Sequence, residues 1–129
     1  MARLLLAGFL IAHGLIHAAI YAIPKNPDKP APFDPSYSWA FAAVHVAERP
    51  TRTFGVRVSW LTAVLFAGAG IALLVNSSLW VSMAICAAAL GLLLKGLFFH
   101  PWLILGVLID IALVWIALVW AATTAGQLP

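Results

Sequence analysis

Two histidines and one aspartate are the residues of this sequence best suited to chemistry, because they interrupt otherwise apolar stretches. His13 and His17 lie four residues apart in RLLLAGFLIAHGLIHAAIY, so a helix places both imidazoles on one face. Asp110 lies in the last apolar run of the chain. Imidazole and carboxylate groups can bind a metal, relay a proton or hydrogen-bond the head of a ligand. These three residues are therefore the first candidates for a site.

The apolar runs, read as helices, place the three residues at similar depths. At 1.5 Å of rise per residue, His13 lies roughly 15 Å and His17 roughly 9 Å from the helix end before Pro24. Asp110 lies roughly 13 to 14 Å from Pro101, at the same end of its helix. A charged side chain near the middle of a bilayer costs about 2.5–3.5 kcal/mol, and a nearby histidine compensates for it. We predict that the histidines meet Asp110 if the first and last helices come together.

Four more polar residues lie on the linker side of the same half of the predicted bundle and complete the candidate set for ligand binding or proton relay. Lys95 and His100 lie at helix ends, where snorkelling or hydrogen bonding to the last carbonyls accounts for them. His45 and Glu48 fit a solvated helix face. No residue is assigned as catalytic.

The spacing of the two histidines leaves alternatives open. His13 and His17 could bind a metal, or each could hydrogen-bond a neighbouring helix, with Asp110 as one partner. The pattern is similar to the zinc-protease motif HExxH, but Gly14 stands where the catalytic glutamate is required, which excludes that mechanism. The four histidines of the chain are too few for a membrane di-iron oxygenase.

The composition is that of an integral membrane protein. Of 129 residues, 64% are hydrophobic and 9% are charged. A span needs roughly 20 apolar residues, so this length allows about four. Short turns between the last three runs make neighbouring helices antiparallel. We predict an all-α fold, a polytopic antiparallel four-helix bundle forming a single transmembrane domain over 1–129, with spans over 4–23, 58–75, 79–98 and 101–122.

The stretch between the first two spans divides into a linker and a short helix. Prolines recur every two or three residues over 24–36, which favours an extended polyproline II strap across one mouth of the bundle. A serine can cap a helix over 37–48, which Pro50 ends. This helix is too short to span and is amphipathic, so we expect it to lie at the membrane interface with Trp39 at headgroup level.

The charges predict orientation rather than a nucleic-acid partner. The net charge is +3, and the basic residues flank apolar runs, where they act as topology determinants. The positive-inside rule places the linker side in the cytoplasm, as part of a multi-pass protein of the bacterial inner membrane. The single cysteine, Cys86, excludes an internal disulfide. Linker-side basic residues are Lys25, Lys29, Arg49, Arg52, Arg57 and Lys95, against Arg3 on the other side.

The first helix, with Arg3, Gly8-Phe9 and His13-Gly14, resembles the opening helix of DoxX-like membrane proteins, which are small four-helix proteins of bacteria. The second run, with Gly68 and Gly70, is loosely similar. The resemblance implies a four-helix bundle and, for some relatives, a link to quinone-coupled sulfur oxidation. The sequence departs from the family pattern after the His-Gly pair, where His17 stands near the position of a usual basic residue.

Three functions follow as hypotheses. The leading one is a small membrane protein without its own catalytic cycle, which favours a protein that is not an enzyme and acts as a subunit or stabilising partner of a membrane assembly. It requires no cofactor, and its partners are the lipid bilayer and other membrane subunits or a second copy. The second is a redox or ligand-binding protein that holds haem, a metal or a quinone, with haem ligated by a first-helix histidine and His100. The third is a proton-coupled small transporter that depends on Asp110.

Overall fold

The computed structural model describes residues 1–22 and 33–125, and within these ranges the chain is helical without strands. This confirms the predicted all-α class. The elements in chain order are α1 (Ala2–Ala22), α2 (Trp39–Ala43), α3 (Glu48–Leu74), α4 (Leu79–Leu97), the 3-10 turn η1 (Pro101–Leu103) and α5 (Ile104–Ala125).

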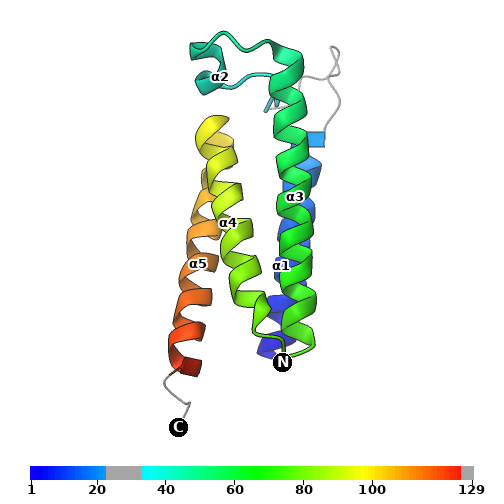
Figure 1. Ribbon diagram of the computed structural model, residues 1–129, viewed down its shortest axis with the longest axis vertical. Helices are drawn as coiled ribbons and strands as arrows, with labels where there is room; N and C mark the ends of the chain where they lie inside the picture. The colour runs from blue at the N-terminus through cyan, green and yellow to red at the C-terminus, as the bar shows by residue number, and fades with distance from the viewer. Residues whose placement is uncertain (23–32, 126–129) are drawn as a thin grey trace.

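The four long helices pack in a defined order of neighbours. α1 packs along α3, α3 along α4, and α4 along α5. The start of α1 and the end of α5 lie at one end of the molecule, and α2 lies at the opposite end (Figure 1). We call these the terminal end and the linker end. α1 and α5 are not among the helix pairs that pack along their length, so the seam between them is held by side chains.

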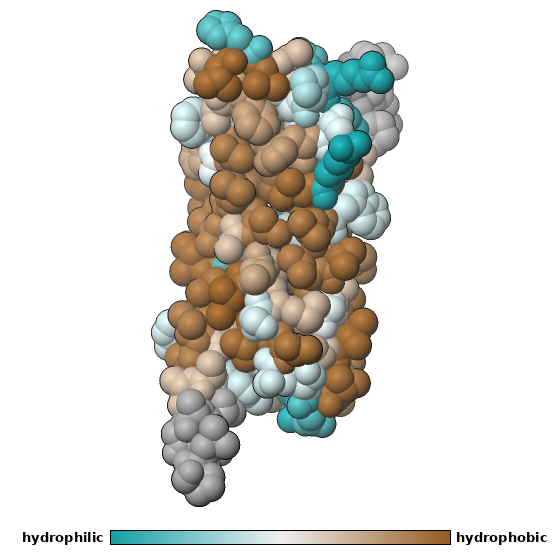
Figure 2. Space-filling view, in the orientation of Figure 1, coloured by the Kyte–Doolittle hydropathy of each residue, from teal (hydrophilic) through white to brown (hydrophobic). Residues whose placement is uncertain are grey.

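The surface of the long helices is apolar. Each of the four is long and apolar enough to cross a membrane, which indicates a multi-pass membrane protein. Figure 2 shows hydrophobic side chains covering the middle of the molecule, with hydrophilic ones gathered toward the two ends. Large side chains such as Leu15, Val64 and Leu105 are more than half exposed, which a lipid environment makes favourable.

Small residues set the spacing between α1 and α3. A Cβ atom at Gly14 would lie 2.8 Å from Cβ of Phe66 and 2.9 Å from the carbonyl oxygen of Ala63. Near the terminal end, a Cβ atom at Gly70 would lie 2.8 Å from the carbonyl oxygen of Ala7. The two backbones therefore approach closely, as small residues allow in membrane helix pairs. This contact holds one face of α1, and with it both histidines, against α3.

The region predicted as one interfacial helix over 37–48 differs in the structure. α2 has only five residues, and a turn follows in which His45 has a φ of 59°. Glu48 instead begins α3, which runs 27 residues and includes the basic stretch before the predicted span. Pro50 does not end a helix here. It lies in the first turn of α3, where backbone amides have no partner within the helix and proline is tolerated.

Only the last part of the proline-rich linker lies within the described residues. Residues 23–32, which carry most of the strap predicted over 24–36, lie outside them. Phe33 is buried, and its ring lies edge-on to Tyr21 at 5.1 Å between centroids. The chain therefore leads into α2 from a point where Phe33 packs against Tyr21 of α1.

The segment at the start of α2 caps the end of α4. Ser38 donates a hydrogen bond from Oγ to the carbonyl oxygen of Leu97 at 2.6 Å, and Trp39 donates from Nε1 to that of Gly96 at 2.7 Å. Both carbonyls belong to the last turn of α4, which has no partners within its own helix. The Ser38 hydroxyl also accepts from the amide of Phe41, so one side chain caps two helices.

We expect Ser38→Ala to lower the free energy of unfolding by about 1–2 kcal/mol, because it removes an N-cap and leaves a partly buried carbonyl without its donor. Thermal unfolding in detergent, followed by circular dichroism, measures the loss. Ser82→Ala is the matched control, since the Ser82 hydroxyl is exposed and donates only within its own helix. Equal stability of the two variants would contradict the capping role.

Candidate functional site

The residues singled out by depth meet at the centre of the site. His13 on α1 donates from Nε2 to Oδ1 of Asp110 on α5 at 2.7 Å. Nε2 of His17 lies 3.5 Å from the same oxygen. The exposed fractions are 5% for His13, 4% for His17 and 0% for Asp110. The predicted contact between the first-helix histidines and Asp110 is therefore confirmed.

Lys95 is the fourth member of this cluster, and its interpretation as a snorkelling residue at a helix end is wrong. Its ammonium donates to Oδ2 of Asp110 at 2.6 Å and to Nε2 of His17 at 3.0 Å, and the residue is 6% exposed. An isolated carboxylate at this depth would be costly. The side chain therefore turns inward, because Asp110 offers a buried ion pair that replaces hydration at the membrane surface.

Two glycines make room for the cluster. A Cβ atom at Gly91 on α4 would lie within 2.8 Å of His17 Cε1 and would overlap the Asp110 carboxylate. A Cβ atom at Gly106 on α5 would lie 2.6 Å from Cε of Lys95. The sequence predicted Gly91 only as one of the small residues, spaced four apart with Ala87, that let helices pack closely, and it connected neither glycine with the site. The signal that could have identified them is their position on helices that also carry Lys95 and Asp110.

An aromatic ring holds the two imidazoles in place. Phe66 on α3 lies edge-on to His13 at 5.0 Å and tilted against His17 at 5.7 Å between ring centroids. The two imidazoles themselves meet edge-on at 4.9 Å. The rings thus fix the direction of both Nε2 atoms toward Asp110.

The three remaining candidates lie apart from the cluster. His45 is exposed in the turn after α2, and Glu48 is exposed in the first turn of α3. His100 precedes η1 and accepts a hydrogen bond at Nδ1 from the amide of Trp102. It caps η1, and it is not in the group of close ligand atoms that His13, His17 and Asp110 form.

A cavity of about 310 Å³ lies in the seam between α1 and α5. Its polar wall consists of His13, His17, Tyr21 and Lys95, whereas Asp110 lies behind them and does not line it. Its rim includes Ile16, Trp102 and Leu105, which are 53%, 54% and 68% exposed. The cavity therefore opens sideways, between two helices, through apolar side chains. The remaining lining residues are Ile20, Leu103, Gly106 and Ile109.

Tyr21 is the cavity residue that sequence analysis missed. It lies four residues after His17 on the same face of α1, it is 2% exposed, and its hydroxyl has no hydrogen-bond partner among the described residues. A buried hydroxyl without a partner costs about 1–3 kcal/mol. The spacing His13, His17, Tyr21 was the available signal, since it repeats every four residues along one helical face.

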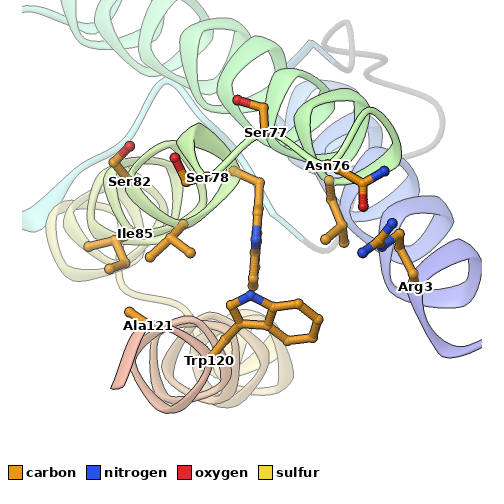
Figure 3. A pocket seen from close by; sticks show the side chains of 11 residues that line it. Arg3, Asn76, Ser77, Ser78, Ser82, Ile85, Trp120 and Ala121 are labelled. Atoms are coloured by element: carbon orange, nitrogen blue, oxygen red, sulfur yellow. The ribbon is translucent and has the colours of Figure 1, made fainter. Parts of the chain in front are cut away.

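A second pocket, of about 720 Å³, lies at the terminal end (Figure 3). Arg3 and Asn76 lie at one edge, and Ser82 and Ala121 lie toward the opposite edge. Among the residues that line this pocket, Arg3 carries the ionisable side chain, and that side chain is exposed. Among the described residues that line this pocket there is no buried charged cluster, so the cavity at the α1–α5 seam is the stronger candidate for a site.

The cluster can donate hydrogen bonds to a ligand while its own charges balance. Lys95 and Asp110 compensate each other, and the groups that face the cavity are chiefly donors. Comparison with known proteins adds no further assignment, because no protein-family model, no curated protein and no solved structure matches the chain.

Proposed function

We propose that this chain is a multi-pass membrane protein that binds the ring of a quinone-class molecule in the cavity between α1 and α5. The observation that carries the proposal is the buried hydroxyl of Tyr21, which has no partner among the described residues and belongs to a side chain that lines an apolar cavity together with Lys95. A ligand that accepts hydrogen bonds would satisfy it.

The membrane setting is a bundle of antiparallel helices in the bacterial inner membrane, with the linker end in the cytoplasm. The support is the positive-inside rule. Arg49, Arg52 and Arg57 lie in the first part of α3, near the linker end, whereas Arg3 lies near the terminal end. Lys95 does not add to this balance, because it is buried against Asp110. The orientation therefore depends on the arginines of α3 and on the lysines of the linker.

The route of entry is lateral. A cavity rimmed by exposed apolar side chains on lipid-facing helices is open to molecules dissolved in the bilayer rather than in water. Its volume, about 310 Å³, is at the lower end of the usual range for small-molecule sites. It therefore suits a single ring, with any hydrocarbon tail remaining among the lipids.

The class of ligand follows from the hydrogen bonds still to be made. Lys95 has three N–H donors and uses two of them on Asp110 and His17. The third donor and the Tyr21 hydroxyl are available to the ligand. A neutral ring with carbonyl oxygens accepts both without adding charge at this depth, where charge is costly. The oxidised quinone fits better than the quinol, whose hydroxyls would need acceptors.

We expect Tyr21→Phe to weaken binding of a decyl-substituted benzoquinone by about 3- to 10-fold, the value of one hydrogen bond. Quenching of tryptophan fluorescence in detergent measures it, and Trp102→Phe identifies the part that comes from the cavity rim. Tyr37→Phe is the matched control, since Tyr37 is 66% exposed and does not line the cavity.

A second pair of variants tests the place of binding. Ile109→Phe adds volume inside the cavity, whereas Ile111→Phe adds it on an α5 residue that is 52% exposed and does not line the cavity. We expect only Ile109→Phe to reduce binding. Wild-type protein that leaves the fluorescence unchanged, or two isoleucine variants that bind equally, would overturn the proposed function.

The role of subunit or stabilising partner in a membrane assembly stays a prediction that is compatible with ligand binding. Proton transport is less well supported. In the part of the chain that the structure describes, the terminal half of the bundle contains Arg3, the N-terminal amine and the thiol of Cys86 as its ionisable groups. Apolar core residues such as Leu10, Leu73 and Ala117 pack together in that half, and such side chains do not relay protons.

A further inference from the structure

We propose that His13, His17 and Asp110 form a binding site for a divalent transition-metal ion such as zinc, which takes the place held by the Lys95 ammonium. Each of the three residues offers one ligand atom, and these atoms all lie within 4.8 Å of one another in a buried cluster. The inference is independent of the proposed quinone site, since it depends on the ligand atoms and not on the cavity.

The distances between the three ligand atoms agree with those around a zinc ion. Zinc binds nitrogen and oxygen at about 2.0–2.2 Å, so two ligands of a tetrahedral ion lie about 3.3 Å apart. Oδ1 of Asp110 lies 2.7 Å from Nε2 of His13 and 3.5 Å from Nε2 of His17. Small side-chain rotations therefore bring the three atoms to bonding distance.

The protonation state of His17 already suits a metal ligand. The Lys95 ammonium has protons to donate and no lone pair to accept with. Its contact of 3.0 Å therefore requires Nε2 of His17 to be the acceptor. A neutral imidazole with a free lone pair is the form that binds metals. His13 donates from Nε2, so metal binding requires its proton to move to Nδ1, with no change in charge.

Lys95 shows that the position favours a cation. Asp110 supplies the negative charge, and the ammonium occupies the space between it and His17. Lys95 lies in the last turn of α4, so its long side chain can swing toward the linker end when an ion displaces it. His13 and His17 also line the cavity, which leaves a fourth coordination position open on that side.

The test is titration of the full chain, purified in mild detergent and stripped with chelator, with Co²⁺ as a spectroscopic substitute for Zn²⁺. We expect one equivalent to bind with intense visible absorption, and Zn²⁺ to displace it. His17→Gln and Asp110→Asn should weaken binding by about 100-fold or more. His45→Gln and His100→Gln are the controls, because neither histidine is in the cluster.

Lys95→Met is the decisive variant, because removal of a competing cation should strengthen metal binding by about tenfold. Because Lys95→Met removes one partner of a buried ion pair, circular dichroism must first show that the variant is folded, and the gain is then measured on the folded protein. The inference is overturned if the wild type binds no stoichiometric metal, if Lys95→Met binds no more tightly, or if the control histidine variants lose binding as well.

Discussion

Asp110→Ala should lower the free energy of unfolding by about 3–5 kcal/mol, the largest loss we expect from replacing any one charged residue of this chain. The carboxylate accepts from His13 and Lys95 in a site where it is fully buried. Without it, the Lys95 ammonium is left without a counter-charge at a depth where hydration cannot replace one. Thermal unfolding in detergent, followed by circular dichroism, measures the effect.

A double variant separates the ion pair from the packing around it. Replacing a buried pair by apolar residues of similar volume is often neutral, whereas removing one partner is costly. Lys95→Met combined with Asp110→Leu should therefore recover most of the stability that Asp110→Ala loses. Arg57→Gln is the control, since Arg57 is exposed and its loss should stay within about 0.5 kcal/mol. If the double variant is as unstable as Asp110→Ala, the loss does not come from an unpaired charge.

The contact between His13 and Asp110 could be predicted because depth along a helix follows from residue number alone. The part played by Lys95 could not. A lysine near a helix end lies within reach of both the membrane surface and the interior. Which of the two its ammonium occupies depends on whether the interior has room for the side chain. That space comes from Gly91 and Gly106, on two different helices, and sequence spacing does not show which glycines face the cluster.

The boundaries of the long helices show a similar limit. The span predicted over 79–98 agrees with α4, because the Asn-Ser-Ser turn and the following Pro101 define it by local chemistry. The predicted start of α3 was wrong, because a proline is compatible both with the end of a helix and with its first turn. Which one applies depends on contacts beyond the local sequence, such as the Ser38 and Trp39 bonds that hold α2 against α4.

The metal and quinone proposals make opposite demands on Lys95. The ammonium contributes a donor to the quinone but competes with the metal for Asp110 and His17. Lys95→Met should therefore weaken quinone binding and strengthen metal binding in the same purified protein. A variant that moves both affinities in the same direction would contradict one of the two assignments, and the Tyr21→Phe result would show which.

Gly14→Ala should lower the free energy of unfolding by about 1–3 kcal/mol, although alanine favours helix over glycine by about 1 kcal/mol. The added methyl would meet Cβ of Phe66 at 2.8 Å and the carbonyl oxygen of Ala63 at 2.9 Å. Backbone atoms cannot turn away as a flexible side chain can, so α1 must move away from α3. His13 is the preceding residue, and its bond to Asp110 would lengthen with that movement.

Gly8→Ala is the matched control, because it lies on the same helix and a Cβ atom there has nothing within 4 Å. It gains the helix propensity without the collision, so its unfolding free energy should rise by up to about 1 kcal/mol. Thermal unfolding of both variants in one detergent compares them directly, and opposite signs are the expected result. Because the same displacement separates His13 from Asp110, Gly14→Ala should also weaken Co²⁺ binding while Gly8→Ala leaves it unchanged. Equal stability of the two variants would mean that the α1–α3 contact does not hold the histidines in place.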